Sequence, residues 1–291
     1  MAALRDIRKR IRSVKSSRKI TAAMKMVAAS KLRRAQEAIV AARPYANELG
    51  ALLRRVASRA TDESGAAPHP LLEVRPLRKA LLVVMTSDRG LCGAFNSNIL
   101  RRAERFLHEH RERFEALEIA TIGRRGRDYF GKRRLHTVRD FAGVFDDLTY
   151  RRATEVAEGV ADEYVRADLD SVFLLYNEFK SAISQRVVVV DLLPVVKEEL
   201  PAGEDVDYEY EPNQVAVLER LVPRYLATLV WRALLESSAA EHGARMTAMD
   251  AATRNAKDLV DRLTLQYNRA RQATITKELM EIVGGAEALK G

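Results

Sequence analysis

Cysteine and aromatic residues are scarce in this sequence. The one cysteine among 291 residues, Cys92, excludes an internal disulfide and any metal site built from several thiolates of one chain, and it fits a reducing compartment. Aromatic residues make up 6% of the chain against 47% for hydrophobic residues as a whole, which favours helices over a β-rich core. No run of eighteen apolar residues occurs, so the sequence predicts no membrane-spanning helix.

Acidic residues and helix breakers are almost missing from the N-terminal region. No Gly or Pro precedes Pro44 and good helix formers dominate, which predicts one helix reaching to about residue 60. Between Met1 and Gln36 there are twelve Lys or Arg and a single acid, Asp6. This excess of eleven positive charges is larger than the net charge of +9 of the whole chain, so the positive charge belongs to the first helix.

An apolar seam runs along this basic helix. Its first part has the alternating spacing of three and four that heptads give, and the same frame returns after an interruption. The first part is Leu4, Ile7, Ile11 and Val14, and the seam resumes at Ala28, Leu32, Ala35 and Ile39. The interruption is Arg18, Thr21 and Lys25, across which we expect a neighbouring stripe of Ile20, Ala23, Met24 and Val27 to carry the apolar face.

The middle of the chain predicts a different fold class. Short apolar runs at 80–86, 118–122, 135–138, 171–176 and 186–193 have the length of strands. Helical spacing separates them at 96–111, 124–130 and 147–166, with Asn96 expected as the N-cap of the first of these helices. Alternating strands and helices indicate a Rossmann-like, open and mostly parallel α/β sheet.

A second long helix is expected near the C-terminus. The expected domains are a first helix at 1–60, a linker at 61–78, an α/β domain at 79–200, a loop with a short helix at 201–222, and a helix at 223–291. The expected seam of the last helix is Met249, Ala252, Ala256, Leu259, Leu263, Gln266, Ala270 and Ala273. Because two such long helices cannot hide their seams in a small domain, we expect them to pair as an antiparallel coiled coil.

No catalytic, cofactor-binding or metal-binding motif emerges. The segment SDRGLCGAFN (87–96) lies between a strand and a helix, where phosphate-binding loops occur, but it matches neither GxGxxG nor a Walker A motif, and Asp88 would repel a phosphate. A tight structural turn is the favoured interpretation. The five histidines show no ligand spacing, and Cys92 has no sequence partner for catalysis.

The basic helix leaves three interpretations open: a solvated face, a nucleic-acid-binding helix, or a helix that docks on acidic protein surfaces. No aromatic residue lies within residues 1–43, which disfavours binding of single strands by stacking. A mitochondrial transit peptide would be similarly basic, but the apolar periodicity continues beyond any plausible cleavage point.

Three segments resemble the ATP synthase gamma subunit family. They are LRDIRKRIRSVKSSRKITAAMKMVAASKLRRAQ at the N-terminus, SDRGLCGAFN after the first strand, and the C-terminal RMTAMDAATRNAKDLVDRLTLQYNRARQATITKELMEIVGGAEAL, with Ile275, Thr276, Glu278, Glu281, Gly285 and Ala286 in its signature. The resemblance covers nearly the whole chain. It implies a non-catalytic rotor shaft inside the hexamer of alpha and beta subunits, with an α/β foot on the epsilon subunit and the c-ring.

The same resemblance implies which residues contact partners. Contacts with the hexamer are expected at Met24, Lys31, Arg33, Arg34, Arg245, Arg271, Gln272, Thr276 and Glu278. Contacts with the ring and epsilon are expected at Tyr208 and Tyr210. It also implies a bacterial, proton-transporting complex in which this chain is peripheral to the cytoplasmic side of the membrane. A basic coiled-coil nucleic-acid-binding protein and a Rossmann-type nucleotide enzyme are the alternatives.

Overall fold

The computed structural model describes residues 2–58, 69–195 and 209–288, with side chains from Leu4 to Gly284. Contacts divide the chain into two units. The terminal unit consists of residues 1–28 and 246–291, and the central unit consists of residues 29–245. Helices α1 (Ala2–Ser58) and α5 (Gln214–Ala288) each contribute to both units.

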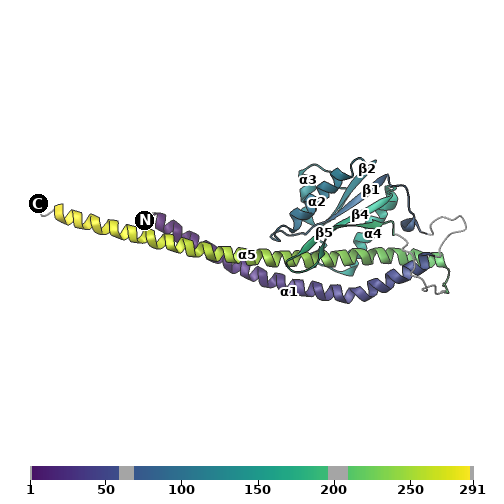
Figure 1. The fold of residues 1–291 in the computed structure, drawn as a ribbon, viewed down its shortest axis with the longest axis horizontal. Coiled ribbons are helices and arrows are strands. Elements are labelled where there is room, and N and C mark those ends of the chain that lie inside the picture. The colour runs from purple at the N-terminus through teal and green to yellow at the C-terminus, as the bar shows by residue number, and fades with distance from the viewer. Residues whose placement is uncertain (1, 59–68, 196–208, 289–291) are drawn as a thin grey trace. The chain divides into compact units, whose positions relative to one another are not determined.

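The central unit contains a five-stranded sheet in the order β3-β2-β1-β4-β5 (Figure 1). Its strands are β1 (Lys79–Met85), β2 (Ala116–Ile122), β3 (Arg139–Phe141), β4 (Ser171–Phe179) and β5 (Gln185–Leu193). The first four are mutually parallel, as expected. The last strand, β5, is antiparallel to β4, so the sheet is mixed; the five residues between the two strands are too few for a crossover connection.

Helices cover both faces of this sheet. The odd-numbered residues of β1, such as Leu81 and Val83, pack with α4 (Tyr150–Arg166) and with the central-unit parts of α1 and α5. The alternate residues Leu82 and Val84 pack with α2 (Phe95–Glu109) and α3 (Arg124–Lys132) on the other face. Because β1 is buried on both faces, its sequence is a continuous apolar run.

Three local expectations are wrong. The third strand lies at 139–141 and not at 135–138. Helix α2 begins at Phe95 with Ala94 as its N-cap, while the Asn96 side chain accepts a hydrogen bond from the Ser87 amide at 3.0 Å. The expected short helix before Pro223 and the break at that residue are also absent from the described chain, since α5 is continuous from Gln214.

Pro223 is accommodated within α5 because its ring lies on the exposed side of the helix. Leu218, Val222 and Leu226 are buried on the opposite face and join the main core, so packing holds the turns on either side of the proline in one helix. Asn213 caps the start of this helix, where its side-chain oxygen accepts a hydrogen bond from the Ala216 amide at 2.9 Å.

Candidate functional site: the exposed faces of the terminal helices

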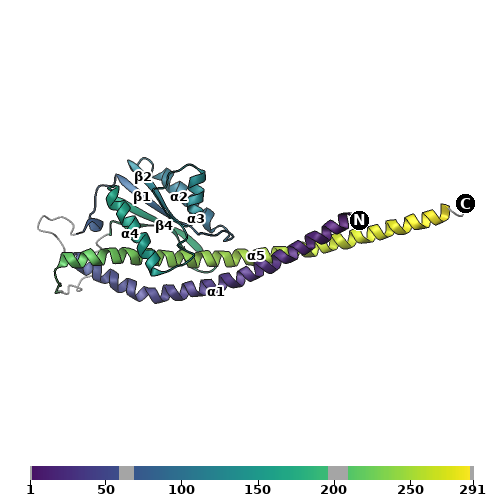
Figure 2. The same ribbon diagram turned by 180° about the vertical axis from the view of Figure 1, so that it is seen from behind.

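The terminal unit is an antiparallel pair formed by the first part of α1 and the last part of α5 (Figure 2). The pairing itself was expected, and the seam on α1 follows the predicted frame through Leu4, Ile7, Ile11 and Val14. On α5 the predicted frame holds at Met249 and Leu263, which are 5% and 9% exposed, but fails at Leu259 between them. Leu259 is 45% exposed, whereas Val260 beside it is 5% exposed, so at this turn the buried residue lies one position further along.

The interruption of the α1 seam is a polar contact across the helix pair. The Thr21 and Thr253 hydroxyls form a hydrogen bond of 2.8 Å, and Lys25 Nζ pairs with Asp250 Oδ1 at 2.6 Å. The hydrogen bond from Lys25, together with the charge of Arg254, lowers the pKa of the Asp250 carboxyl from its ordinary value. Two of the three gap residues, Thr21 and Lys25, therefore take partners on the opposite helix, whereas the Arg18 side chain has no hydrogen bond or ion pair among the described residues.

The expected apolar replacement stripe does not cover this gap. Ile20 and Val27 are 58% and 57% exposed, and Met26 beside them is 68% exposed, while Met24 is half-buried. The stripe is wrong as a seam because polar side chains of α5 pair with two of the three gap residues. Its apolar residues instead form an outward face on α1, which is a feature typical of protein contact sites.

Positive charge on the outer side of α1 is mostly uncompensated. Arg8 donates a hydrogen bond of 2.7 Å to the Tyr267 hydroxyl, and Lys25 pairs with Asp250. Within the described chain no ion pair involves the exposed Lys9, Arg10, Arg12, Lys15 and Lys19. Arg8, Arg12, Lys15 and Lys19 line one shallow groove with Ile11 and Ser16. Such a surface fits a partner that supplies carboxylates.

The expected contact residues near the end of α5 are also accessible. Arg271, Gln272, Thr276 and Glu278 are all exposed in the terminal unit. Ile275, Leu279, Met280 and Ile282 around them are 53%, 58%, 64% and 72% exposed. A surface that mixes exposed polar and apolar side chains can contact a partner protein without forming strong, fixed ion pairs with it.

In the central unit, three expected contact residues on α1 are exposed and one on α5 is not. Lys31, Arg33 and Arg34 are exposed, and among the described residues Arg33 pairs with Glu37 one turn away at 2.9 Å. Arg245, by contrast, has a side chain that is 11% exposed and pairs with the buried Glu241 at 2.5 Å. Because these contacts lie within the chain, the side chain of Arg245 has a structural role.

Arg245 links α5 to the loop after β1. Besides Glu241, it donates to the Gly90 carbonyl at 3.2 Å and lies 3.2 Å from His242 Nδ1. Burial lowers the pKa of His242 to about 4, with the positive charges of Arg245 and Lys31 acting in the same direction. Burial raises the pKa of Glu241 in spite of its arginine partner. Glu241 and Arg245 have the i,i+4 spacing of a helical ion pair, which the sequence contains, but the contact of Arg245 with the distant Gly90 has no signal in the sequence.

The SDRGLCGAFN segment has a structural role, because it connects the end of β1 to the start of α3 and to the loop after β3. Asp88 accepts hydrogen bonds from the amides of Arg124 and Gly143, each at 2.9 Å, and of Phe145 at 3.1 Å. Its carboxylate thus occupies the N-terminus of α3, the position that a phosphate would take in a nucleotide-binding loop. Gly123 ends the neighbouring strand with φ +94°, where a Cβ would meet the Thr86 carbonyl oxygen at 2.2 Å. This geometry argues against a nucleotide site here.

Other chemistry has little support in the described residues. Among them, no group of three or more His, Cys, Asp or Glu side chains is placed to hold a metal ion. Cys92 is buried, and burial raises the pKa of its thiol, which disfavours a reactive thiolate. No helix among them is long and apolar enough to cross a membrane.

The structure describes one of the two tyrosines that are expected to contact the ring and epsilon. Tyr208 lies outside the described residues. Tyr210 packs against the main core of the central unit, and its buried hydroxyl has no hydrogen-bond partner among the described residues. An unpaired buried hydroxyl is costly, so Tyr210 is a position where a partner group would be favourable.

Comparison with known proteins decides the family. A family model described as ATP synthase matches residues 3–289. The ATP synthase gamma chain of Anaeromyxobacter sp. (strain Fw109-5) is 57% identical over 291 residues, with complete coverage of both chains. The chain belongs to the ATP synthase gamma chain family. The gamma chain of Geobacter metallireducens, at 51% identity over 292 residues, agrees with this assignment.

Solved structures of mitochondrial ATP synthases contain chains with the same fold. The central stalk and c-ring structure of the Tetrahymena thermophila mitochondrial ATP synthase matches with a TM-score of 0.61 at 28% identity, covering 80% of this chain and 99% of that chain. A chain of the Euglena gracilis mitochondrial ATP synthase matches with a TM-score of 0.68 at 22% identity, covering 99% and 95%. The predicted fold class, a mostly parallel α/β sheet with paired terminal helices, is therefore confirmed.

Proposed function

We propose that this chain is the central rotor stalk of a proton-translocating ATP synthase. It transmits rotation of the c-ring to the catalytic sites of an alpha/beta hexamer, and it has no catalytic site or cofactor of its own. The observation that carries the proposal is the match to gamma chains over the entire length, at up to 57% identity among the relatives compared. Both terminal helices, on which the contacts with the hexamer depend, lie within that match.

The terminal unit is the part that we assign to the hexamer. Its cations outnumber their partners on α1, and attraction to acidic loops would act at many rotational angles because the charges spread along the helix. Met24 and the exposed apolar residues beside it would contact the beta subunits. Arg271, Gln272, Thr276 and Glu278 would contact them elsewhere along the shaft, together with Lys31, Arg33 and Arg34 of the central unit.

Arg245 acts in a different way in this proposal. Because its guanidinium is held by Glu241 and Gly90, it stabilises the attachment of α5 to the α/β domain instead of reaching a partner. The central unit is the foot, which binds the epsilon subunit and the c-ring in the region of Tyr208 and Tyr210. The complex would be bacterial, with this chain peripheral to the cytoplasmic side of the inner membrane.

Co-purification tests the proposal. A tag on this chain, expressed in its natural background, should recover alpha and beta subunits together with Mg²⁺-dependent ATPase activity. Epsilon and c subunits should appear when the membrane is solubilised gently. The purified chain alone should hydrolyse no ATP.

Two results would overturn this function. Recovery of nucleic acid in place of alpha and beta subunits, with no ATPase activity, would favour the basic coiled-coil nucleic-acid binder. Stoichiometric nucleotide binding by the purified chain alone would favour a Rossmann-type enzyme.

A further inference from the structure

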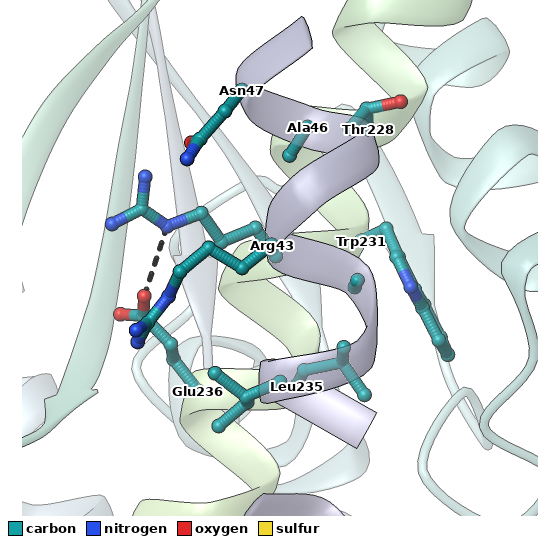
Figure 3. Close-up of a pocket in the computed structure, with 10 residues that line it drawn as sticks. Arg43, Ala46, Asn47, Thr228, Trp231, Leu235 and Glu236 are labelled. Carbon is teal, nitrogen blue, oxygen red and sulfur yellow. Dashed lines mark hydrogen bonds and ion pairs between the residues drawn. The ribbon is translucent and has the colours of Figure 1, made fainter. Parts of the chain in front are cut away.

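A crevice separates α1 from α5 within the central unit (Figure 3). Its volume of about 330 Å³ lies at the lower end of the range of roughly 300–1,000 Å³ that small-molecule pockets occupy. The lining residues are Ile39, Ala42, Arg43, Ala46 and Asn47 of α1 and Thr228, Trp231, Arg232, Leu235 and Glu236 of α5. Ala42 and Ala46 leave the space open because their side chains are too small to fill it.

The polar groups of the crevice are unevenly paired. Glu236 is satisfied, since it accepts from Arg232 Nε at 3.0 Å and from the Tyr176 hydroxyl at 3.2 Å. The guanidinium of Arg43 and the amide of Asn47, in contrast, have no hydrogen bond or ion pair with any residue that the structure describes. The two arginines and one carboxylate sum to a net positive charge, so the crevice has spare donors and favours an anion.

The remaining lining residues are mostly apolar, so the crevice suits a ligand with an apolar body. Figure 3 shows Arg43 and Asn47 on one side of α1 and Trp231 on the other, with Leu235 between the helices. Ile39, Ala42, Ala46 and Leu235 form the apolar walls. A ligand that reaches from the arginine to the tryptophan must therefore pass beneath α1, which suits a narrow, flexible chain better than a broad ring system.

We propose that this crevice binds a medium-chain fatty carboxylate. The carboxylate accepts hydrogen bonds from Arg43 and Asn47, and the alkyl chain lies between α1 and α5 toward Trp231. Transfer of each buried methylene from water contributes roughly 0.8 kcal/mol to such binding. The site is separate from the contacts assigned to the hexamer, and the inference does not depend on the proposed function.

The single tryptophan makes the test direct. Trp231 is the only tryptophan of the chain, so fluorescence of the purified full-length protein that is excited selectively at tryptophan, and not at the nine tyrosines, reports on the crevice. Decanoate, titrated at concentrations that form no micelles, should give a saturable change in tryptophan emission. Arg43→Ala should weaken this binding by about tenfold, the size of effect typical of a hydrogen-bonded charge. Ala46→Leu should abolish it by filling the crevice.

Matched controls separate specific binding from general hydrophobic adsorption. Decyltrimethylammonium has the same tail with a positive head and should give no saturable change. Arg220→Ala removes an exposed arginine of α5 outside the crevice and should bind decanoate as the wild type does. Circular dichroism would show whether Ala46→Leu is folded, and if it is not, Arg43→Ala decides. No saturation with decanoate, equal affinity for the cationic probe, or unchanged affinity in Arg43→Ala would overturn the proposal.

Discussion

At the scale of single residues, the chain uses charge in two opposite ways. Cations on the outside of α1 are solvated and largely unpaired, whereas Arg245 and Glu241 form a buried pair beside the neutral His242. Breaking a buried pair costs much more than breaking an exposed one, because a desolvated charge is left without compensation. Residues with the same chemistry therefore serve recognition in one place and stability in the other.

His242 should make the central unit acid-sensitive. In the unfolded chain its pKa is near the ordinary value of 6.5, whereas burial in the folded protein holds the pKa at about 4. Between these values the unfolded state binds more protons, so stability falls as the pH is lowered through this window. We expect His242→Gln, which can still accept a hydrogen bond from Arg245, to remove about 2 kcal/mol of the stability difference between about pH 7 and pH 5.

Urea unfolding of the full chain at both pH values would measure this effect. His108→Gln, at an exposed histidine of α2, is the matched control and should keep the wild-type dependence on pH. Glu241, Arg245 and Lys31 surround His242 and remain in both variants. An equal loss of stability on acidification in wild type and His242→Gln would show that another group is responsible.

At the scale of elements, the terminal helix pair has a seam that is apolar at intervals and polar at Thr21, Lys25, Asp250 and Thr253. Polar contacts in a seam fix the register of a helix pair at some cost in stability. The alanines beside them supply little side-chain volume, so the larger buried residues Met249, Val260 and Leu263 of α5 contribute much of the apolar burial.

Two leucines of α5 test where this seam lies. Leu263 is 9% exposed and Leu259 is 45% exposed, although they have the same side chain and are one turn apart. Leu263→Ala should destabilise the helix pair by about 2 kcal/mol, the lower end for buried leucines. Leu259→Ala should change stability by less than about 0.5 kcal/mol, as surface substitutions do.

Hydrogen exchange of amides in residues 2–28 and 246–284 would resolve these effects. Equal destabilisation by both substitutions would contradict the observed seam. Similar effects are what the heptad spacing predicted, since both leucines belong to the expected seam.

At the scale of the whole molecule, the charge distribution fits the rotor role that we propose, in which the helix pair meets acidic loops of a partner. Positive charge is concentrated at the N-terminal part of the chain, and the remaining residues are close to neutral. Charge spread along a helix favours association with an acidic partner without selecting one rotational angle. Coupling is then decided by contacts that change with angle, and Met24 is the residue that we expect to make one of them.

Met24→Lys should therefore impair coupling more than assembly. A lysine at this half-buried position adds a charge where an apolar contact is proposed. We expect the ratio of ATP-driven proton pumping to ATP hydrolysis in inverted vesicles to fall by at least about twofold, a modest coupling effect. Met26→Lys introduces the same charge at a residue that is 68% exposed and should change the ratio less. A proportional fall of pumping and hydrolysis in Met24→Lys would refute this role.

The sequence by itself determined the local elements and the family. Long runs free of Gly and Pro fix helices, continuous apolar runs fix buried strands, and the cations of α1 are exposed because charge stays in water. Asp88 was predicted to oppose a phosphate, and its three amide hydrogen bonds agree. The helices, the buried strands and the exposed cations depend on residues close together in the chain, whereas the amide partners of Asp88 lie in the distant segments of Arg124, Gly143 and Phe145.

Only the tertiary structure decided which residues meet across the chain. The seam moved from Leu259 to Val260, and the stripe with Ile20 and Val27 became an outer surface, because the facing helix decides which side is buried. The direction of β5 followed from a short turn, and α5 continues through Pro223 because both sides pack on one core. The Arg245 network and the crevice under Arg43 join segments that are distant in sequence, and no local pattern records such contacts.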